Sequence, residues 1–371
     1  MNKIYVTKPF LPPFNEFVKR LESVWESGIL TNCGPHYQQL EVALKQHLGA
    51  TNLTLLNNGT MALLAALEVL EVEGEVITTP YSFVATSHSL LWRKCKPVFV
   101  DVSPTDCNID PVKVAQAINS RTNAILAVHC YGFPCDVEAL QEIAAKHGLK
   151  LIYDAAHAFG VKYRSSSILQ YGDASTLSFH ATKIFNTIEG GSVTFASVEN
   201  DIKARKLSNF GFDNEVSVSA IGLNFKLNEI QAVMGLAQLG YLDQISNKRK
   251  YIAQRYGCEL SGLDGVGFPR ARDFSEINNS YYPIFVDPVE GRSRNDLYEF
   301  LKERGVYSRR YFYPLINNFE IYQKTLAGKK LFLPVAESLS ERVLCLPIYP
   351  SLSDEEQTRV ISGIKEFFGA R

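Results

Sequence analysis

Three polar segments of the sequence each follow a run that has the character of a buried strand, and a fourth is a polar turn that opens a long helix. In chain order they centre on Gly59 and Thr60, on Asp154, on Lys183, and on Asn224. Ligands of open parallel sheets bind beyond the carboxyl ends of the strands, so these segments are expected to meet at one site. Their residue types could supply an anion cradle, a buried carboxylate and a reactive amine.

The segment at Gly59 and Thr60 could bind a phosphate. A glycine lets the backbone approach an anion closely, and the first amides of a following helix point outward beside the threonine hydroxyl. Taken alone, Asn58-Gly59-Thr60 is more typical of a plain turn and helix cap. The phosphate interpretation therefore depends on the other segments.

Asp154 and Lys183 carry the groups best suited to catalysis. A carboxylate directly after an apolar strand is costly to bury unless it meets a cation or several hydrogen-bond donors. A lysine desolvated behind a buried strand has a lowered pKa, which suits Schiff-base formation. The alternatives are ordinary: Asp154 as a turn cap, His157 as a hydrogen-bonded core residue, and Lys183 as a solvated loop lysine.

Strand and helix patterns alternate between these segments, which indicates an α/β layer with a mostly parallel sheet. Helices are predicted at Thr60 to Leu70, at Val137 to Lys146 behind an N-cap at Asp136, and at Asn228 to Leu242. The seven predicted strands are Leu53 to Leu56, Glu75 to Thr78, Pro97 to Val100, Ala124 to Val128, Lys150 to Asp154, Thr176 to Phe179 and Ser192 to Phe195.

A second region follows the basic stretch Lys248-Arg249-Lys250. It has proline-punctuated segments, the aromatic run Tyr311 to Pro314, a helix near Ser293 to Glu303 and a terminal helix near Asp354 to Phe367. We therefore predict a large domain over residues 1–245, which includes the N-terminal segment, and a smaller α+β domain over residues 246–371. A chain of 371 residues is long enough for both.

Composition excludes several classes of function. The formal charge is −1, from 38 basic and 39 acidic residues, so no overall charge attracts nucleic acid or an anionic membrane. The longest apolar run, Met61 to Leu67, is far shorter than the ~20 residues of a membrane span, and no signal-peptide pattern opens the chain, so a cytoplasmic location is expected. Seven scattered cysteines without a CxxC pair indicate neither a disulfide framework nor a metal site.

Together the four segments resemble the DegT/DnrJ/EryC1/StrS family of sugar aminotransferases. The similarity runs over nearly the whole chain, in the same order and at the same spacing. Thr31 to Pro35 is similar to the family's opening T-N-x-G-P segment, and Gly222 to Glu229 to its G-x-N-x-R-M-N-E block. The resemblance implies pyridoxal 5′-phosphate (PLP) as cofactor and the type I aspartate-aminotransferase fold. In that fold a large PLP-binding domain holds a central seven-stranded sheet.

The resemblance also implies a role for each candidate residue. Lys183 matches the lysine that forms a Schiff base with PLP and then moves the catalytic proton. Asp154 matches the carboxylate that keeps the pyridine nitrogen protonated. His157 is similar to the residue beside the ring's phenolic oxygen, where many members carry glutamine, and Phe83 matches the ring that stacks on the cofactor. The implied phosphate ligands are Gly59, Thr60, Ser178 and, from the other subunit of a homodimer with composite sites, Asn224.

The stretch around Lys183 implies which sugar carbon is aminated. Ser178 to Lys183, followed by Thr187 to Gly191, resembles members that act at carbon 4 of a nucleotide-linked 4-keto sugar. The implied substrate is dTDP-4-keto-6-deoxyglucose, with L-glutamate as amino donor. The implied product, dTDP-4-amino-4,6-dideoxyglucose, would serve O-antigen or other glycan synthesis. The implied substrate contacts are His180, Lys226 and Tyr313.

Two segments depart from the family pattern where substrate contacts are expected. Leu315 is followed by Ile316 rather than histidine, and Lys226-Leu227 replaces Arg-Met. A carbon-3 sugar aminotransferase and a UDP-sugar 4-aminotransferase therefore stay as alternatives. A PLP-dependent sugar dehydratase is disfavoured, because such relatives carry histidine in place of Lys183. A PLP-binding regulator without enzymatic activity is disfavoured by the complete set of cofactor residues.

Overall fold

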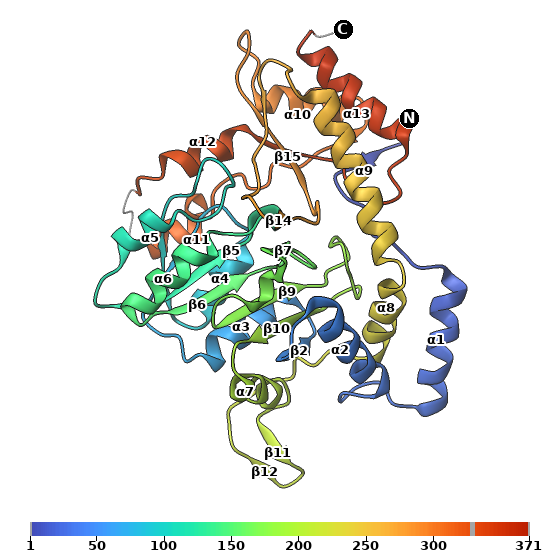
Figure 1. The fold of residues 1–371 in the computed structure, drawn as a ribbon, viewed down its shortest axis with the longest axis vertical. Coiled ribbons are helices and arrows are strands. Elements are labelled where there is room, and N and C mark those ends of the chain that lie inside the picture. The colour runs from blue at the N-terminus through green and yellow to red at the C-terminus, as the bar shows by residue number, and fades with distance from the viewer. Residues whose placement is uncertain (1, 327–330, 370–371) are drawn as a thin grey trace.

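A seven-stranded sheet lies at the centre of the computed structural model, which describes residues 2–326 and 331–369 (Figure 1). The strand order is β2-β10-β9-β6-β5-β3-β4, and β10 runs antiparallel to both neighbours while the other pairs are parallel. The strands are β2 (Leu53–Leu56), β3 (Glu75–Thr78), β4 (Lys96–Phe99), β5 (Thr122–Val128), β6 (Lys150–Asp154), β9 (Ala174–Ser178) and β10 (Gly191–Phe195). All seven predicted strands are confirmed, with ends within two residues.

Helices cover both faces of this sheet. Along β5, Ile125 and Ala127 enter one buried cluster while Ala124 and Leu126 enter another, so the strand is apolar throughout. The first cluster is closed by α2 (Pro35–Leu48), α6 (Val137–His147) and α8 (Glu229–Leu239). The second is closed by α3 (Gly59–Val69), α4 (Val84–Trp92) and α7 (Val198–Ser208). The predicted N-cap of α6 is confirmed, because the Asp136 side chain accepts a hydrogen bond from the Ala139 amide.

The predicted helix Asn228 to Leu242 is wrong beyond Leu239. There α8 ends at Gly240, and a new helix, α9 (Leu242–Leu260), begins after Tyr241. Tyr241 packs against Phe10 of the N-terminal segment at this point, with ring centroids 5.3 Å apart. Helix α9 passes through residue 245 without interruption, and the domain division at that point stays a prediction.

The C-terminal region has its own sheet and core. The sheet is antiparallel in the order β13-β15-β17, and α9, α10 and α13 pack around one buried cluster with it. The helices predicted near Ser293 to Glu303 and near Asp354 to Phe367 are confirmed as α10, which Ser293 caps, and α13. The start of the chain joins this region through parallel β1 and β16. The bounds are β1 (Ile4–Tyr5), β13 (Val266–Gly267), β15 (Tyr282–Val286), β16 (Val306–Tyr307), β17 (Val343–Leu346), α10 (Arg294–Glu303) and α13 (Asp354–Phe367).

Shorter elements lie around these two parts. Strands β11 (Phe212–Asn214) and β12 (Ser217–Val218) form a hairpin that projects from the body beyond α7 (Figure 1). No helix in residues 2–326 and 331–369 is long and apolar enough to cross a membrane. The remaining elements are α1 (Phe14–Ser27), α5 (Pro111–Ala117), α11 (Glu320–Thr325), α12 (Pro334–Arg342), β7 (Lys162–Tyr163), β8 (Ser166–Ser167), β14 (Ser275–Glu276) and 3₁₀ turns at Cys130–Gly132, Ile168–Gln170 and Ile316–Asn318.

Candidate active site

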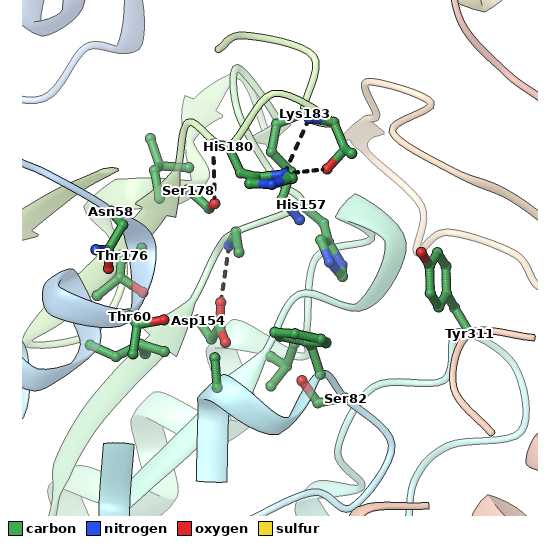
Figure 2. Close-up of a pocket in the computed structure, with 18 of the residues that line it drawn as sticks. Asn58, Thr60, Ser82, Asp154, His157, Thr176, Ser178, His180, Lys183 and Tyr311 are labelled. Carbon is green, nitrogen blue, oxygen red and sulfur yellow. Dashed lines mark hydrogen bonds between the residues drawn. The ribbon is translucent and has the colours of Figure 1, made fainter. Parts of the chain in front are cut away.

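A cavity of about 310 Å³ lies at the carboxyl edge of the central sheet (Figure 2). Asp154 is the last residue of β6 and Ser178 the last of β9, so both side chains are delivered to this edge by neighbouring strands. The structure brings most of the predicted residues together here. Those that line the cavity are Gly59, Thr60, Phe83, Asp154, His157, Ser178, His180 and Lys183.

The start of α3 lies directly against the end of β9. A Cβ on Gly59 would stand 2.8 Å from the Cβ of Ser178, so this approach requires glycine. Asn58 caps the helix by accepting a 2.9 Å hydrogen bond from the Met61 amide. The helix N-terminus and the hydroxyls of Thr60 and Ser178 thus share one wall of the cavity (Figure 2). Such a wall suits a phosphate, since amides at a helix start lack partners within the helix.

Asp154 is a buried carboxylate held by two donors. Its Oδ2 accepts a 2.7 Å hydrogen bond from the Thr86 hydroxyl, and its Oδ1 accepts one of 3.1 Å from the Ala156 amide. Burial raises the pKa of Asp154, while both hydrogen bonds and the charge of Lys183 oppose this rise. A carboxylate fixed in this way would be stabilised by a cationic group bound in the cavity.

Lys183 lies in the turn that follows β9, where its amide donates a 2.9 Å hydrogen bond to the His180 carbonyl. Burial lowers the pKa of Lys183 to about 8, and the charge of Asp154 works in the opposite direction. Near pH 7 the Lys183 amine is therefore neutral in a larger fraction of molecules than an exposed lysine would be. The neutral amine is the nucleophilic form.

His157 is a neutral imidazole within an aromatic wall. Its ring stacks on Phe312 with centroids 6.0 Å apart and meets the edge of Tyr281 at 4.8 Å. Burial, followed by the charge of Lys183, holds the pKa of His157 well below its usual value. Its buried Nδ1 atom has no hydrogen-bond partner among the residues that the structure describes. The ring can therefore offer a donor and an acceptor to a bound ligand.

His180 and Glu189 form a polar pair on the Lys183 side of the cavity. The Thr182 amide donates a 3.2 Å hydrogen bond to Nδ1 of His180. In a neutral ring the proton is thereby assigned to Nε2, which lies 3.5 Å from Oε1 of Glu189. Both side chains stay about half exposed, so they remain available to a substrate.

Three predicted residues lie elsewhere. Asn224 is exposed, and its backbone forms an antiparallel β-bridge with Asn209. The Lys226 ammonium donates a 2.7 Å hydrogen bond to the side-chain oxygen of Asn209. The guanidinium carbon of Arg294 lies over the ring of Tyr313, 4.6 Å from the ring centroid. The described residues lining this cavity include none of these three, and their roles stay predictions. Asn224 was expected to act in the other subunit, which is compatible with its exposed position.

Sequence reasoning missed several residues of the cavity wall. Glu189 lies within the segment that resembles the carbon-4 enzymes, so its position could have been inferred from that segment. Tyr281, Tyr311 and Phe312 come from a part of the chain well beyond Lys183. The aromatic run from Tyr311 to Pro314 stands out in the sequence, but nothing local places it at this cavity, and no local pattern marks Tyr281.

Comparison with known proteins decides the family. The model described as the DegT/DnrJ/EryC1/StrS aminotransferase family matches residues 14–365. The chain belongs to this family. It is 44% identical over 363 residues to the dTDP-4-amino-4,6-dideoxy-D-glucose transaminase of Shigella dysenteriae, covering 98% of both chains. It is also 44% identical over 353 residues to the transaminase of the same name from Escherichia coli, covering 95% of both.

A solved structure agrees with this membership. The structure of DesI in the presence of its TDP-sugar product matches the chain with a TM-score of 0.94 at 32% identity, covering 99% of this chain and 93% of DesI. The resemblance found in the sequence is thus confirmed, together with the α/β fold of PLP-dependent aminotransferases, the transaminase activity and PLP as the cofactor.

The cavity fits PLP on three independent features. Glycine at position 59 lets the N-terminus of α3 lie directly against Ser178, so the helix amides and the Ser178 hydroxyl form one wall that suits a phosphate. Asp154 is a buried carboxylate on which a pyridinium nitrogen could be held. Phe83, at the N-terminus of α4, is a large apolar side chain that is 60% exposed, and it lines the cavity, where a flat ring could cover it.

Proposed function

We propose that this aminotransferase transfers the amino group of L-glutamate to carbon 4 of dTDP-4-keto-6-deoxyglucose, giving dTDP-4-amino-4,6-dideoxyglucose. The observation that carries the proposal is the identity of 44% along 98% of both chains to the Shigella dysenteriae transaminase of that product. The proposed use of the product is O-antigen or other glycan synthesis. The proposed place is the cytoplasm, in keeping with cysteines that are free throughout the described chain.

The proposed binding roles divide the cavity into three parts. The amides at the start of α3, with the hydroxyls of Thr60 and Ser178, hold the cofactor phosphate. Asp154, fixed by Thr86 and Ala156, holds the protonated pyridine nitrogen. Phe83 covers one face of the ring.

The proposed catalytic work belongs to Lys183. When bound, PLP supplies an electron sink that weakens the C–H bond next to the substrate nitrogen. The Lys183 amine, whose pKa is about 8, can take up that proton and return it near neutral pH, because the energies of its charged and neutral forms are close. His157 stays neutral and donates a hydrogen bond to the phenolic oxygen of the cofactor.

The proposed sugar contacts involve the pair next to Lys183. The Nε2–H of His180 and the carboxylate of Glu189 present a donor and acceptors beside the reactive amine, which suits sugar hydroxyl groups. Lys226 and Tyr313 stay proposed contacts to the substrate. Because neither lines the cavity of its own chain, the nucleotide end of the substrate is where they would act.

A homodimer with composite sites is part of the proposal. Val216 and Ile221, in the segment with the β11–β12 hairpin, are 91% and 95% exposed, and Leu223 is 59% exposed. Apolar side chains gathered at the tip and base of a projecting arm are typical of a surface that another subunit covers. Asn224 follows directly and would reach the phosphate of the partner's cofactor.

The test is a substrate panel with glutamate as donor. The purified enzyme is incubated with dTDP-4-keto-6-deoxyglucose, its 3-keto isomer and a UDP-linked 4-keto sugar, and products are analysed by NMR and mass spectrometry. The proposal predicts nitrogen on carbon 4 of the dTDP sugar and far slower turnover of the others. Nitrogen on carbon 3 would refute the assigned carbon, and a preference for the UDP sugar would refute the nucleotide.

A further inference from the structure

The turn before Tyr281 is fixed by Asn278 to the loop that follows β6. The Asn278 amide group donates hydrogen bonds of 2.9 Å to the carbonyls of His157 and Phe159. Its oxygen accepts a 3.0 Å hydrogen bond from the Ser280 amide, which closes the turn. A Cβ on Gly132 would lie 2.7 Å from that oxygen, so a glycine makes room for the contact.

Arg249 of α9 holds the same turn from the other side. It is only 2% exposed, and its Nη1 donates hydrogen bonds of 3.2 Å to the carbonyls of Asn279 and Ser280. Among the described residues, Arg249 forms no ion pair with a carboxylate. Burial lowers the pKa of Arg249 to about 10. Burying a cation without a carboxylate is costly, and both hydrogen bonds of this guanidinium go to the backbone of the turn.

Both anchors place the Tyr281 ring against the residues proposed to act. The ring meets His157 edge-on at 4.8 Å and stands nearly perpendicular to Tyr311 at 5.7 Å. The Lys183 ammonium lies 5.8 Å from the centroid of the same ring. At that distance the face of a phenol ring attracts a cation. One side chain therefore contacts both groups from the C-terminal region.

We propose that Tyr281 is a positioning residue of the transamination: its aromatic ring, anchored by Arg249 and Asn278, keeps Lys183 and His157 in the arrangement in which they act. The inference rests on the proposed roles of Lys183 and His157. It assigns the effect to the ring rather than to the phenol hydroxyl, because every contact described above is made by the ring.

The first test measures Lys183 in the cofactor-free protein, by competitive chemical labelling across pH 6 to 11. Other titratable groups around this lysine are Asp154, His157, His180, Glu189 and Tyr311. Tyr281→Leu keeps an apolar side chain at this position but removes the attraction of the ring for the ammonium. The labelling midpoint should therefore fall by about half a pH unit. Tyr281→Phe keeps the ring and should leave the midpoint unchanged.

Tyr282→Leu is the matched control. Neighbouring residues at a strand point to opposite sides, and Tyr282 packs against Tyr256 in the C-terminal core, with centroids 5.0 Å apart. This variant should leave the Lys183 midpoint unchanged. An unshifted midpoint in a folded Tyr281→Leu protein, or an equal shift in Tyr282→Leu, would overturn the proposal. Tyr281→Met serves in the same way if the leucine variant does not fold.

The second test separates positioning from binding. In the single-turnover half-reaction with glutamate, Tyr281→Leu should lower the limiting rate constant at least about tenfold with little change in the apparent Kd of glutamate, because misplacement of the reacting groups slows the chemical step. Tyr281→Phe should keep the limiting rate constant near the wild-type value. A rise in the apparent Kd alone would contradict the proposal. Neither test uses a keto sugar, so an error in the proposed sugar substrate would not affect the result.

Discussion

The hydroxyl of Thr86 donates a 2.7 Å hydrogen bond to Asp154, and this contact joins the first turn of α4 to the end of β6. A second hydroxyl, that of Ser82, lies 2.8 Å from Thr86 and extends the connection. Phe83 precedes α4 directly, so the same short segment supports the carboxylate and carries the aromatic ring proposed to stack on the cofactor. The positions of the Asp154 carboxylate and the Phe83 ring therefore depend on each other.

Removal of the Thr86 hydroxyl should weaken PLP binding. Thr86→Val has nearly the same shape but leaves one oxygen of a buried carboxylate without its donor, a loss of about 1–3 kcal/mol. The affinity for PLP, measured by fluorescence titration of the cofactor-free protein, should fall about tenfold or more. Thr86→Ser keeps the hydroxyl and should bind PLP nearly as well as wild type. Equal affinities in the valine and serine variants would contradict this role.

Asp154→Asn should slow turnover by orders of magnitude while a coloured cofactor complex persists. An uncharged amide cannot stabilise a protonated ring nitrogen, and each tenfold loss of rate corresponds to about 1.4 kcal/mol of barrier. Single-turnover kinetics with glutamate, together with the visible spectrum, measure both properties. Turnover near the wild-type rate would show that the pyridine nitrogen has another partner.

Gly59→Ala should lower the affinity for PLP at least about tenfold, because the new methyl group would meet Ser178 at 2.8 Å and force α3 away from β9. Gly240→Ala is the matched control, since its Cβ would have only an ordinary contact of 3.7 Å with the Ala237 carbonyl. Equilibrium dialysis of PLP against both variants compares them. Equal binding would contradict the close approach at Gly59.

Lys183 should make the cofactor-free protein less stable at neutral than at alkaline pH. Its pKa is about 8 in the folded chain and higher when unfolded, so between these values the unfolded state binds more protons and stability rises with pH. Below about pH 8 the full cost of the buried charge is present. Lys183→Met should therefore be more stable than wild type at pH 7, by a margin that shrinks towards pH 10.5. Urea unfolding of both proteins across this pH range measures the difference in their free energies of unfolding. A difference that does not change with pH would show that Lys183 is not desolvated.

Mixing two inactive variants should restore activity through hybrid dimers. A dimer of Lys183→Ala with Asn224→Ala contains one site with both residues intact, and random exchange makes half of the dimers hybrids. The mixture should recover about a quarter of wild-type activity. Native mass spectrometry verifies the exchange. Absence of recovery despite verified exchange would contradict composite sites.

The central sheet could be predicted because its strands carry local signals. The runs that end at Leu56, Asp154 and Ser178 are short, contain residues that favour buried strands and are followed by polar turns. The residues at those carboxyl edges could then be grouped before any contact was known. Local patterns failed where packing decided, as at Gly240, where the contact between Phe10 and Tyr241 accompanies the end of α8.

The far wall of the cavity could not be predicted in the same way. Tyr281 follows a turn that Asn278 and Arg249 hold by hydrogen bonds, and it lies near Lys183 from a distant part of the chain. Such contacts join distant residues and leave no periodic pattern. The family resemblance supplied the cofactor and the residues around it, but it gave no position to Tyr281 or Thr86.

Lys183 is proposed to be the residue to which PLP attaches and the residue that performs the catalytic proton transfer. The most direct measurement is borohydride reduction of the purified holoenzyme, followed by proteolysis and mass spectrometry of the peptides. We expect one modified peptide, carrying the reduced cofactor on Lys183, and loss of activity in proportion to that label. Attachment to a different lysine, or complete inactivation with no labelled lysine, would contradict it.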